Sequence, residues 1–96
     1  MYRKNANSTL FLLGDHILHI LEINPQIVLQ MEDVSEALGT SQKNIDNLLR
    51  RHYIGFLTIK GSGTTIQLSD EIRVEDLQEH IDTLKSDSDL SKERLR

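Results

Sequence analysis

The sequence has no cysteine, no tryptophan and a single proline, and its only aromatic residues are two tyrosines and two phenylalanines. The lack of cysteine excludes disulfides and thiolate metal sites. So few aromatic side chains leave an aliphatic core, and they do not supply the stacking platform that single-stranded nucleic acid needs. The longest purely apolar run, residues 10–13, is too short for a membrane span or a secretory signal. We therefore expect a soluble cytoplasmic protein.

Charge is distributed unevenly along the 96 residues, which are enough for one small domain. The net charge is −4, with −3 on residues 1–39 and −4 on residues 70–96, whereas residues 40–69 carry +3. Electrostatic attraction acts locally, over a Debye length of about 8–10 Å. The middle third is therefore the part of the chain whose charge favours a polyanion.

The N-terminal third predicts a helix that runs to about Ile23, is capped by Ser8 or Thr9 and ends at Asn24-Pro25. Its apolar residues cover about half of the helical wheel, which is wider than the usual stripe. These residues are Leu10, Phe11, Leu13, Ile17, Leu18, Ile20 and Leu21. Such a wide face needs a second covering surface, either the C-terminal helix or another subunit.

Residues 26–52 predict a short strand, a helix, a tight turn and a second helix. The strand is expected at 26–30, and the helix at 31–38 with Val34, Ala37 and Leu38 facing inward. Gly39 suits the left-handed position after a helix, and Ser41 suits the N-cap of a helix over 41–52. The spacing places Ile45, Leu48, Leu49 and His52 on one side of that helix. The opposite arc holds Gln42, Lys43, Asp46, Asn47, Arg50 and Arg51.

The last third predicts a β-hairpin and a helix. Two alternating runs flank Gly61-Ser62-Gly63 and predict a hairpin over 56–68. A helix is expected over 73–85, with a narrow apolar seam of Val74, Leu77, Ile81 and Leu84. Residues 86–96 are expected to be a disordered tail or a frayed helical extension. The predicted fold is thus mainly α with a small β-hairpin.

This order of elements resembles the winged helix-turn-helix family of DNA-binding proteins over about residues 9–85. The specific match is Asp33-Val34-Ser35-Glu36-Ala37-Leu38-Gly39, which is similar to the family's second helix and the glycine that ends it. Ser41 stands where the family's recognition helix is capped, although Thr40 replaces the usual aliphatic residue before it. The resemblance implies a domain over residues 1–85, with helix 41–52 in the DNA major groove and hairpin 56–68 as the wing.

The expected role in this setting is sequence-specific or semi-specific binding of double-stranded DNA by a small regulator. Amide side chains suit base edges, cations suit phosphates, and Asp46 either accepts from cytosine or repels the DNA. The expected DNA-binding residues are Ser41, Gln42, Lys43, Asn44, Asn47, Arg50, Arg51, Lys60, Ser62 and Thr64. The alternatives are a solvated helix face and a winged-helix module that binds a protein partner. The acidic region 70–96 would suit a basic partner.

The seam of the last helix allows two arrangements: it folds back on the first helix, or it packs across a two-fold axis. The wide face of the first helix favours a homodimer, with Leu10, Phe11, Val74, Leu77, Ile81 and Leu84 at the interface. No enzymatic motif or cofactor site is recognisable. His16 and His19 lack a third convergent ligand, so we expect no metal site. His80 is expected on an exposed, acidic face.

Overall fold

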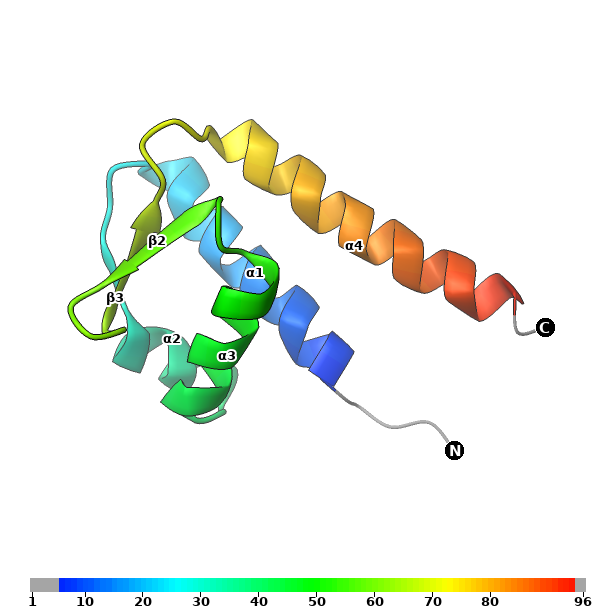
Figure 1. The fold of residues 1–96 in the computed structure, drawn as a ribbon, viewed down its shortest axis with the longest axis horizontal. Coiled ribbons are helices and arrows are strands. Elements are labelled where there is room, and N and C mark those ends of the chain that lie inside the picture. Colours follow the sequence, from blue (N-terminus) through cyan, green and yellow to red (C-terminus); the bar gives the residue numbers. More distant parts are fainter. Residues whose placement is uncertain (1–5, 95–96) are drawn as a thin grey trace.

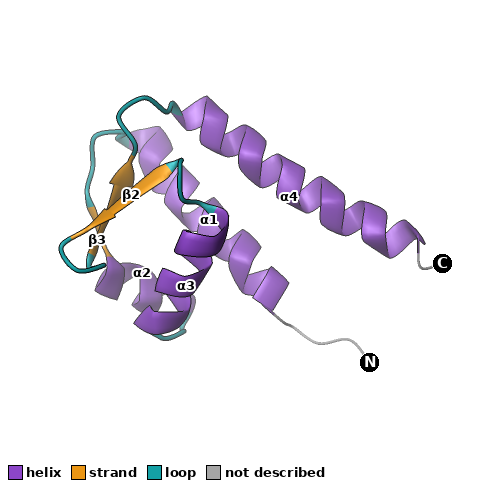
Figure 2. Ribbon diagram, viewed as in Figure 1, coloured by secondary structure: helices purple, strands orange, loops and turns teal. Residues whose placement is uncertain are grey.

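The computed structural model describes the backbone of residues 6–94 and the side chains of residues 9–86. Its elements follow the order α1 (Ala6–Ile23), β1 (Leu29–Gln30), α2 (Met31–Leu38), α3 (Gln42–His52), β2 (Leu57–Lys60), β3 (Thr65–Leu68) and α4 (Val74–Arg94) (Figure 1). The fold consists of four helices and a small three-stranded sheet, which lies at one end of the molecule (Figure 2). The predicted fold class and order of elements are confirmed.

Helix α1 begins earlier than the sequence indicated. Ser8 and Thr9 lie inside the helix, which has started by Ala6, so the prediction that either residue caps it is wrong. Alanine and asparagine, the first two residues of α1, are compatible with a helix, and a serine can lie inside a helix as well as cap it. The C-terminal end is as predicted, at Ile23.

Helix α2 ends in a Schellman motif that sets the tight turn before α3. Gly39 is left-handed, with φ 66°, and its N–H donates to the Glu36 carbonyl while the Thr40 N–H donates to the Ser35 carbonyl. Val34 is buried and Leu38 is half-buried, but Ala37 is exposed, so its predicted inward position is wrong. The side of α2 that faces the core instead takes Met31 and Ser35.

The three strands pair antiparallel in the order β1-β3-β2. Ile66 is the buried centre of the sheet, since it pairs with Ile59 on β2 and with Leu29 on β1. The strand predicted over 26–30 is only two residues long. A turn causes this, because the side chain of Asn24 accepts from the Gln26 N–H and its carbonyl accepts from the Ile27 N–H, which leads the chain away from β3.

Helix α4 folds back along α1 within the same chain (Figure 1). Leu77 and Ile81 are fully buried with Leu10 in the core, and Lys85 forms an ion pair with Asp15 at 3.3 Å. Val74 and Leu84 pack partly buried against the same core, and Phe11 is half-buried. The intrachain arrangement is therefore the one found. Leu10, Leu77 and Ile81, which were expected at a dimer interface, are thus already buried within one chain. The homodimer itself stays a prediction.

The end predicted for the last helix, Lys85, is also wrong, because the backbone of α4 stays helical through Arg94. Residues 86–94 contain neither glycine nor proline, so nothing in the sequence stops the helix there. Residues 95–96 of the expected tail lie outside the described part of the chain. Among residues 6–94, no helix has the length and apolar character needed to cross a membrane.

The largest fully buried side chain among those that the structure describes is that of Tyr53, at the C-terminal end of α3. Its hydroxyl donates to the Leu10 carbonyl of α1 at 3.0 Å, which satisfies the polar end of the ring. Gly14 makes this approach possible, because a Cβ there would lie 2.5 Å from the Tyr53 hydroxyl and 3.1 Å from Ile81. Tyr53 thus joins α3 to α1 beneath α4.

Replacing Gly14 by alanine should destabilise the protein, although alanine is the better helix former. We expect the free energy of unfolding to fall by about 1–3 kcal/mol, the typical cost of overpacking a core. Urea unfolding measures this. In a Tyr53→Phe background the hydroxyl is gone, so the Gly14→Ala substitution should cost clearly less. Equal costs in both backgrounds would contradict the close contact as the cause.

Burial, and secondarily the charge of Asp15, raises the pKa of Tyr53 far above its usual value of 10. Above pH 10 the unfolded chain therefore loses a phenolic proton that the folded protein keeps. Stability that is fully present below pH 10 should then decline as the pH rises further, by up to about 1.4 kcal/mol per pH unit. Urea unfolding between pH 9 and 11.5 checks this against Tyr53→Phe, whose decline should be shallower.

Candidate nucleic-acid interface

Helix α3 is held at its N-terminus by two side-chain bonds across the turn. The Ser41 hydroxyl accepts from the Asn44 N–H at 3.1 Å, which is the predicted N-cap. The Asn44 side chain in turn donates to the Thr40 hydroxyl at 3.0 Å. Thr40, which departs from the family pattern, thus forms a polar tie across the turn. It also occupies an amide donor of Asn44 that was predicted to contact bases.

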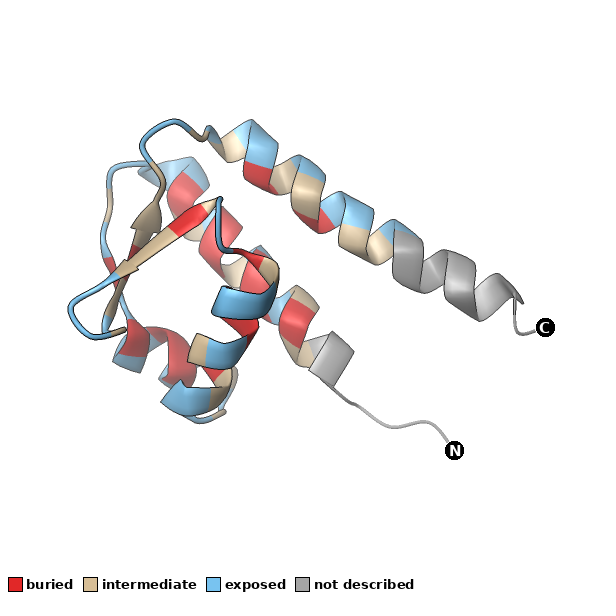
Figure 3. Ribbon diagram, viewed as in Figure 1, coloured by how far each residue is buried: buried red, intermediate tan, exposed pale blue. Residues whose placement is uncertain are grey.

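The two sides of α3 differ as predicted. Ile45, Leu48 and Leu49 are buried against the core, and His52 is half-buried. The outward side carries polar residues and is exposed, as the pale blue segments of α3 show (Figure 3). Its exposed residues are Gln42, Lys43, Asn47, Arg50 and Arg51. The helix therefore offers solvent a continuous surface of amides and cations.

Asp46 and Arg50 form an ion pair on this surface. The Arg50 Nε donates to both carboxylate oxygens, at 2.9 and 3.1 Å. Because only Nε is used, the two terminal nitrogens of the guanidinium keep their donors for another partner. The i,i+4 spacing of an acid and an arginine on a helix was a readable signal for this pair, which the sequence reasoning overlooked. Asp46 thus orients Arg50 and also cancels part of its charge.

The hairpin tip lies beside the same pair. A Cβ built on Gly63 would be 3.4 Å from an Asp46 carboxylate oxygen and 3.5 Å from a terminal nitrogen of Arg50. Gly61, Ser62 and Gly63 all have positive φ, so the tip is a tight left-handed turn in which Ser62 adopts a conformation rare for a residue with a side chain. The Thr64 hydroxyl donates to the Gly61 carbonyl at 2.7 Å and braces this turn.

Most predicted binding residues are therefore brought onto one surface, which we call the α3–wing surface. It comprises the exposed side chains of α3, the tip residues Ser62 and Thr64, and Lys60 immediately before the tip. Three of its cations, Lys43, Arg51 and Lys60, form no ion pair with any residue that the structure describes. Ser41 and Asn44 belong to the turn that holds α3, and their polar groups are already partly used.

His80 and His52 contribute to packing between α3 and α4. His80 was predicted on an exposed face, which is wrong: it is half-buried, stacked on Phe56 with ring centroids 4.4 Å apart and set edge-on to Tyr53. Its ring nitrogen donates to the His52 carbonyl at the end of α3. The turn of 53–57 brings Phe56 under α4, which helical periodicity alone does not reveal. Within the described residues, no three metal-binding side chains converge.

Ser41→Ala should lower the free energy of unfolding by about 1 kcal/mol, the usual cost of losing an N-cap. Thermal or urea unfolding measures it. Ser86→Ala is the matched control, because Ser86 is an exposed residue inside α4, where alanine is neutral or slightly favourable. Equal effects of the two substitutions would show that the bond between the Ser41 side chain and Asn44 contributes nothing.

Comparison of this chain with protein-family models, with curated proteins and with solved structures finds no match. The resemblance to winged helix-turn-helix proteins therefore rests on the residues and on the order of elements. Any function has to be argued from the chain's own surfaces.

Proposed function

We propose that this protein binds double-stranded DNA, with α3 in the major groove and the β2–β3 hairpin as a wing against the backbone. The observation that carries the proposal is the α3–wing surface, where unpaired cations and free amides lie on a capped helix beside a hairpin tip. It coincides with residues 40–69, whose net charge of +3 contrasts with the acidic remainder of the chain. A helix exposed in this way fits the width of the major groove.

The residues divide into two roles in this proposal. Gln42 and Asn47 have exposed amides and are the best candidates for hydrogen bonds to base edges. Lys43, Arg51 and Lys60 neutralise phosphates and fix the register without reading sequence. Arg50, held by Asp46 through Nε, points its terminal donors to a base or phosphate, and Asp46 acts on DNA through Arg50.

The proposal extends to a small cytoplasmic regulator that performs no chemistry of its own and acts by occupying DNA or by recruiting a partner. We also predict a homodimer. Because α4 covers α1 within one chain, the dimer would have to form through a surface other than the contact between these two helices. Light scattering at micromolar concentration tests it, and a monomeric mass would contradict it.

The affinity for duplex DNA should fall as the salt concentration rises, and the steepness of this fall should reflect the number of phosphates that the protein neutralises. Four cations on the surface predict a slope of log affinity against log salt of about −3 to −4 per bound chain. Arg51→Ala should make this slope shallower by about 0.9, the loss of one phosphate contact. Fluorescence anisotropy with a random-sequence duplex between 50 and 200 mM salt measures both.

Arg73→Ala is the matched control, because it removes the same charge from an exposed residue at the start of α4, outside the α3–wing surface. Its slope should equal that of the unsubstituted protein. Arg50→Ala is less suitable, since it also leaves Asp46 without its partner. No duplex binding at low salt would refute the proposed function. Equal slope changes for Arg51→Ala and Arg73→Ala would refute the placement of the interface.

A further inference from the structure

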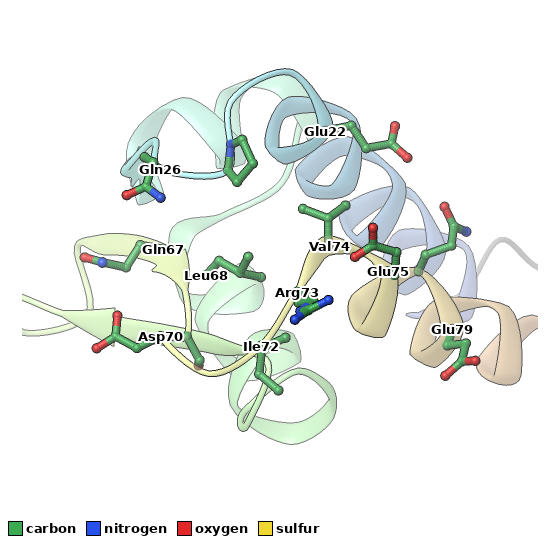
Figure 4. A pocket seen from close by; sticks show the side chains of 13 residues that line it. Glu22, Gln26, Gln67, Leu68, Asp70, Ile72, Arg73, Val74, Glu75 and Glu79 are labelled. Atoms are coloured by element: carbon green, nitrogen blue, oxygen red, sulfur yellow. The ribbon is translucent and has the colours of Figure 1, made fainter.

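A groove lies between the end of α1, the end of β3 and the start of α4, with a volume of about 800 Å³ (Figure 4). Pro25 is among its lining residues. Gln26 lies on one side, and the side chains of Leu68 and Val74 point into the space between it and α4 (Figure 4). With Ile72 they give the groove an apolar floor. None of its lining residues belongs to the α3–wing surface. The groove is therefore a second candidate binding surface.

The sheet has an open edge at this groove. β1 pairs with β3 only at Leu29–Ile66 and Gln30–Thr65, while β2 continues along β3 to Leu68. The turn at Asn24 leads the chain away from β3 and leaves room beside Leu68, which lines the groove. Unpaired strand edges of this kind are templates for an added strand.

The direction of the Leu68 backbone follows from alternation along β3. The Ser69 N–H donates to the Phe56 carbonyl, on the side of β2. The Thr64 carbonyl accepts from the Met31 N–H, on the side of β1. Peptide groups of successive residues in a strand alternate between its two edges, so Leu68 shares the direction of Thr64. Its N–H and C=O thus point to the edge that β1 has left.

The rim of the groove is acidic. Four exposed carboxylates, those of Glu22, Asp70, Glu75 and Glu79, stand against the single cation Arg73. None of these five side chains forms an ion pair with another described residue. The rim therefore has a net negative charge that its own side chains do not compensate, and it attracts cations.

We infer that this groove binds an extended, basic segment of a protein partner. The segment adds a short strand beside Leu68, in the mode in which peptides extend a sheet. Because side chains alternate in a strand, every second residue faces the floor of Leu68, Ile72 and Val74 and is aliphatic. Lysine or arginine residues between them face the carboxylates of Glu75 and Glu79. The inference does not depend on the proposed DNA binding, because the two surfaces share no residue.

The test uses a fluorescein-labelled peptide of sequence Lys-Val-Lys-Val-Lys with blocked ends, and the full-length protein. Fluorescence anisotropy should show saturable binding, which the double variant Glu75→Lys/Glu79→Lys weakens by about fivefold or more. Hydrogen exchange of the Leu68 amide should slow when the peptide binds, because that amide gains a partner. A Lys-Pro-Lys-Pro-Lys peptide has the same charge but lacks two N–H donors, so it should bind more weakly.

The matched control is Glu32→Lys/Glu36→Lys, which makes the same charge change at exposed positions of α2 outside the groove. Its affinity for the peptide should stay close to that of the unsubstituted protein. An equal loss in both double variants would overturn the inference, since binding would then follow net charge alone. Absence of peptide binding, or an unchanged rate of exchange at Leu68 with bound peptide, would also overturn it.

Two other occupants give distinct results that would overturn the assignment to a partner peptide. The first is a small cation, for which spermidine is the probe. If spermidine slowed hydrogen exchange of the Leu68 amide as much as the peptide does, the groove would bind small cations and not specifically a peptide. The second is another copy of this chain. Sedimentation would then show a mass that rises with concentration, and the double variant Glu75→Lys/Glu79→Lys would abolish this rise.

Discussion

The arrangement of the helices depends on how the buried side chain of Tyr53 packs between them. Its ring lies where the end of α3 meets α1 and α4, its hydroxyl is satisfied by the Leu10 carbonyl, and Gly14 leaves the space it needs. Above it, His80 of α4 bonds the last turn of α3 and stacks on Phe56. Together with the buried Ile45, Leu48 and Leu49 of α3, Tyr53 thus holds α3 against the core and determines the direction in which its polar side faces.

Once α4 covers α1, four large apolar side chains stay exposed among the residues whose burial the structure describes: Leu12, Ile23, Val28 and Ile54. The wide apolar side of α1 was the main reason to expect a second subunit, and the intrachain contacts of Leu77 and Ile81 supply that cover. What remains exposed is mostly polar and divided by charge. The α3–wing surface is cationic, whereas the groove at the start of α4 is anionic. Two surfaces of opposite charge, rather than an apolar face for self-association, are therefore the candidate binding surfaces of the protein.

Local signals carried most of the prediction from sequence. Gly39, Ser41, Gly61 and Gly63 each act within a few residues, and each has the conformation or bond that its residue type favours, whereas Ser62 is drawn into a positive φ between its two glycines. Some local predictions failed too, such as the start of α1 and the end of α4. The failures that matter most for the arrangement of the helices are contacts between distant residues. Periodicity predicted the apolar seam of α4 but not which helix this seam packs against. It also could not show that His80 would stack on Phe56 and be partly buried there. The shortened β1 is intermediate, because Asn24-Pro25 signalled a turn but not how far the turn would displace the strand.

The separation of charge gives the proposed DNA complex a preferred orientation. Both surfaces belong to one domain, yet the net charge of −4 hides a basic zone of +3 between acidic segments. At physiological salt each charge acts over about 8 Å, so DNA near α3 senses Lys43, Arg51 and Lys60 rather than the acidic rim. The carboxylates of the groove repel DNA from that part of the chain. The same carboxylates attract a basic segment to the groove, so DNA and a protein partner would not compete for the same residues.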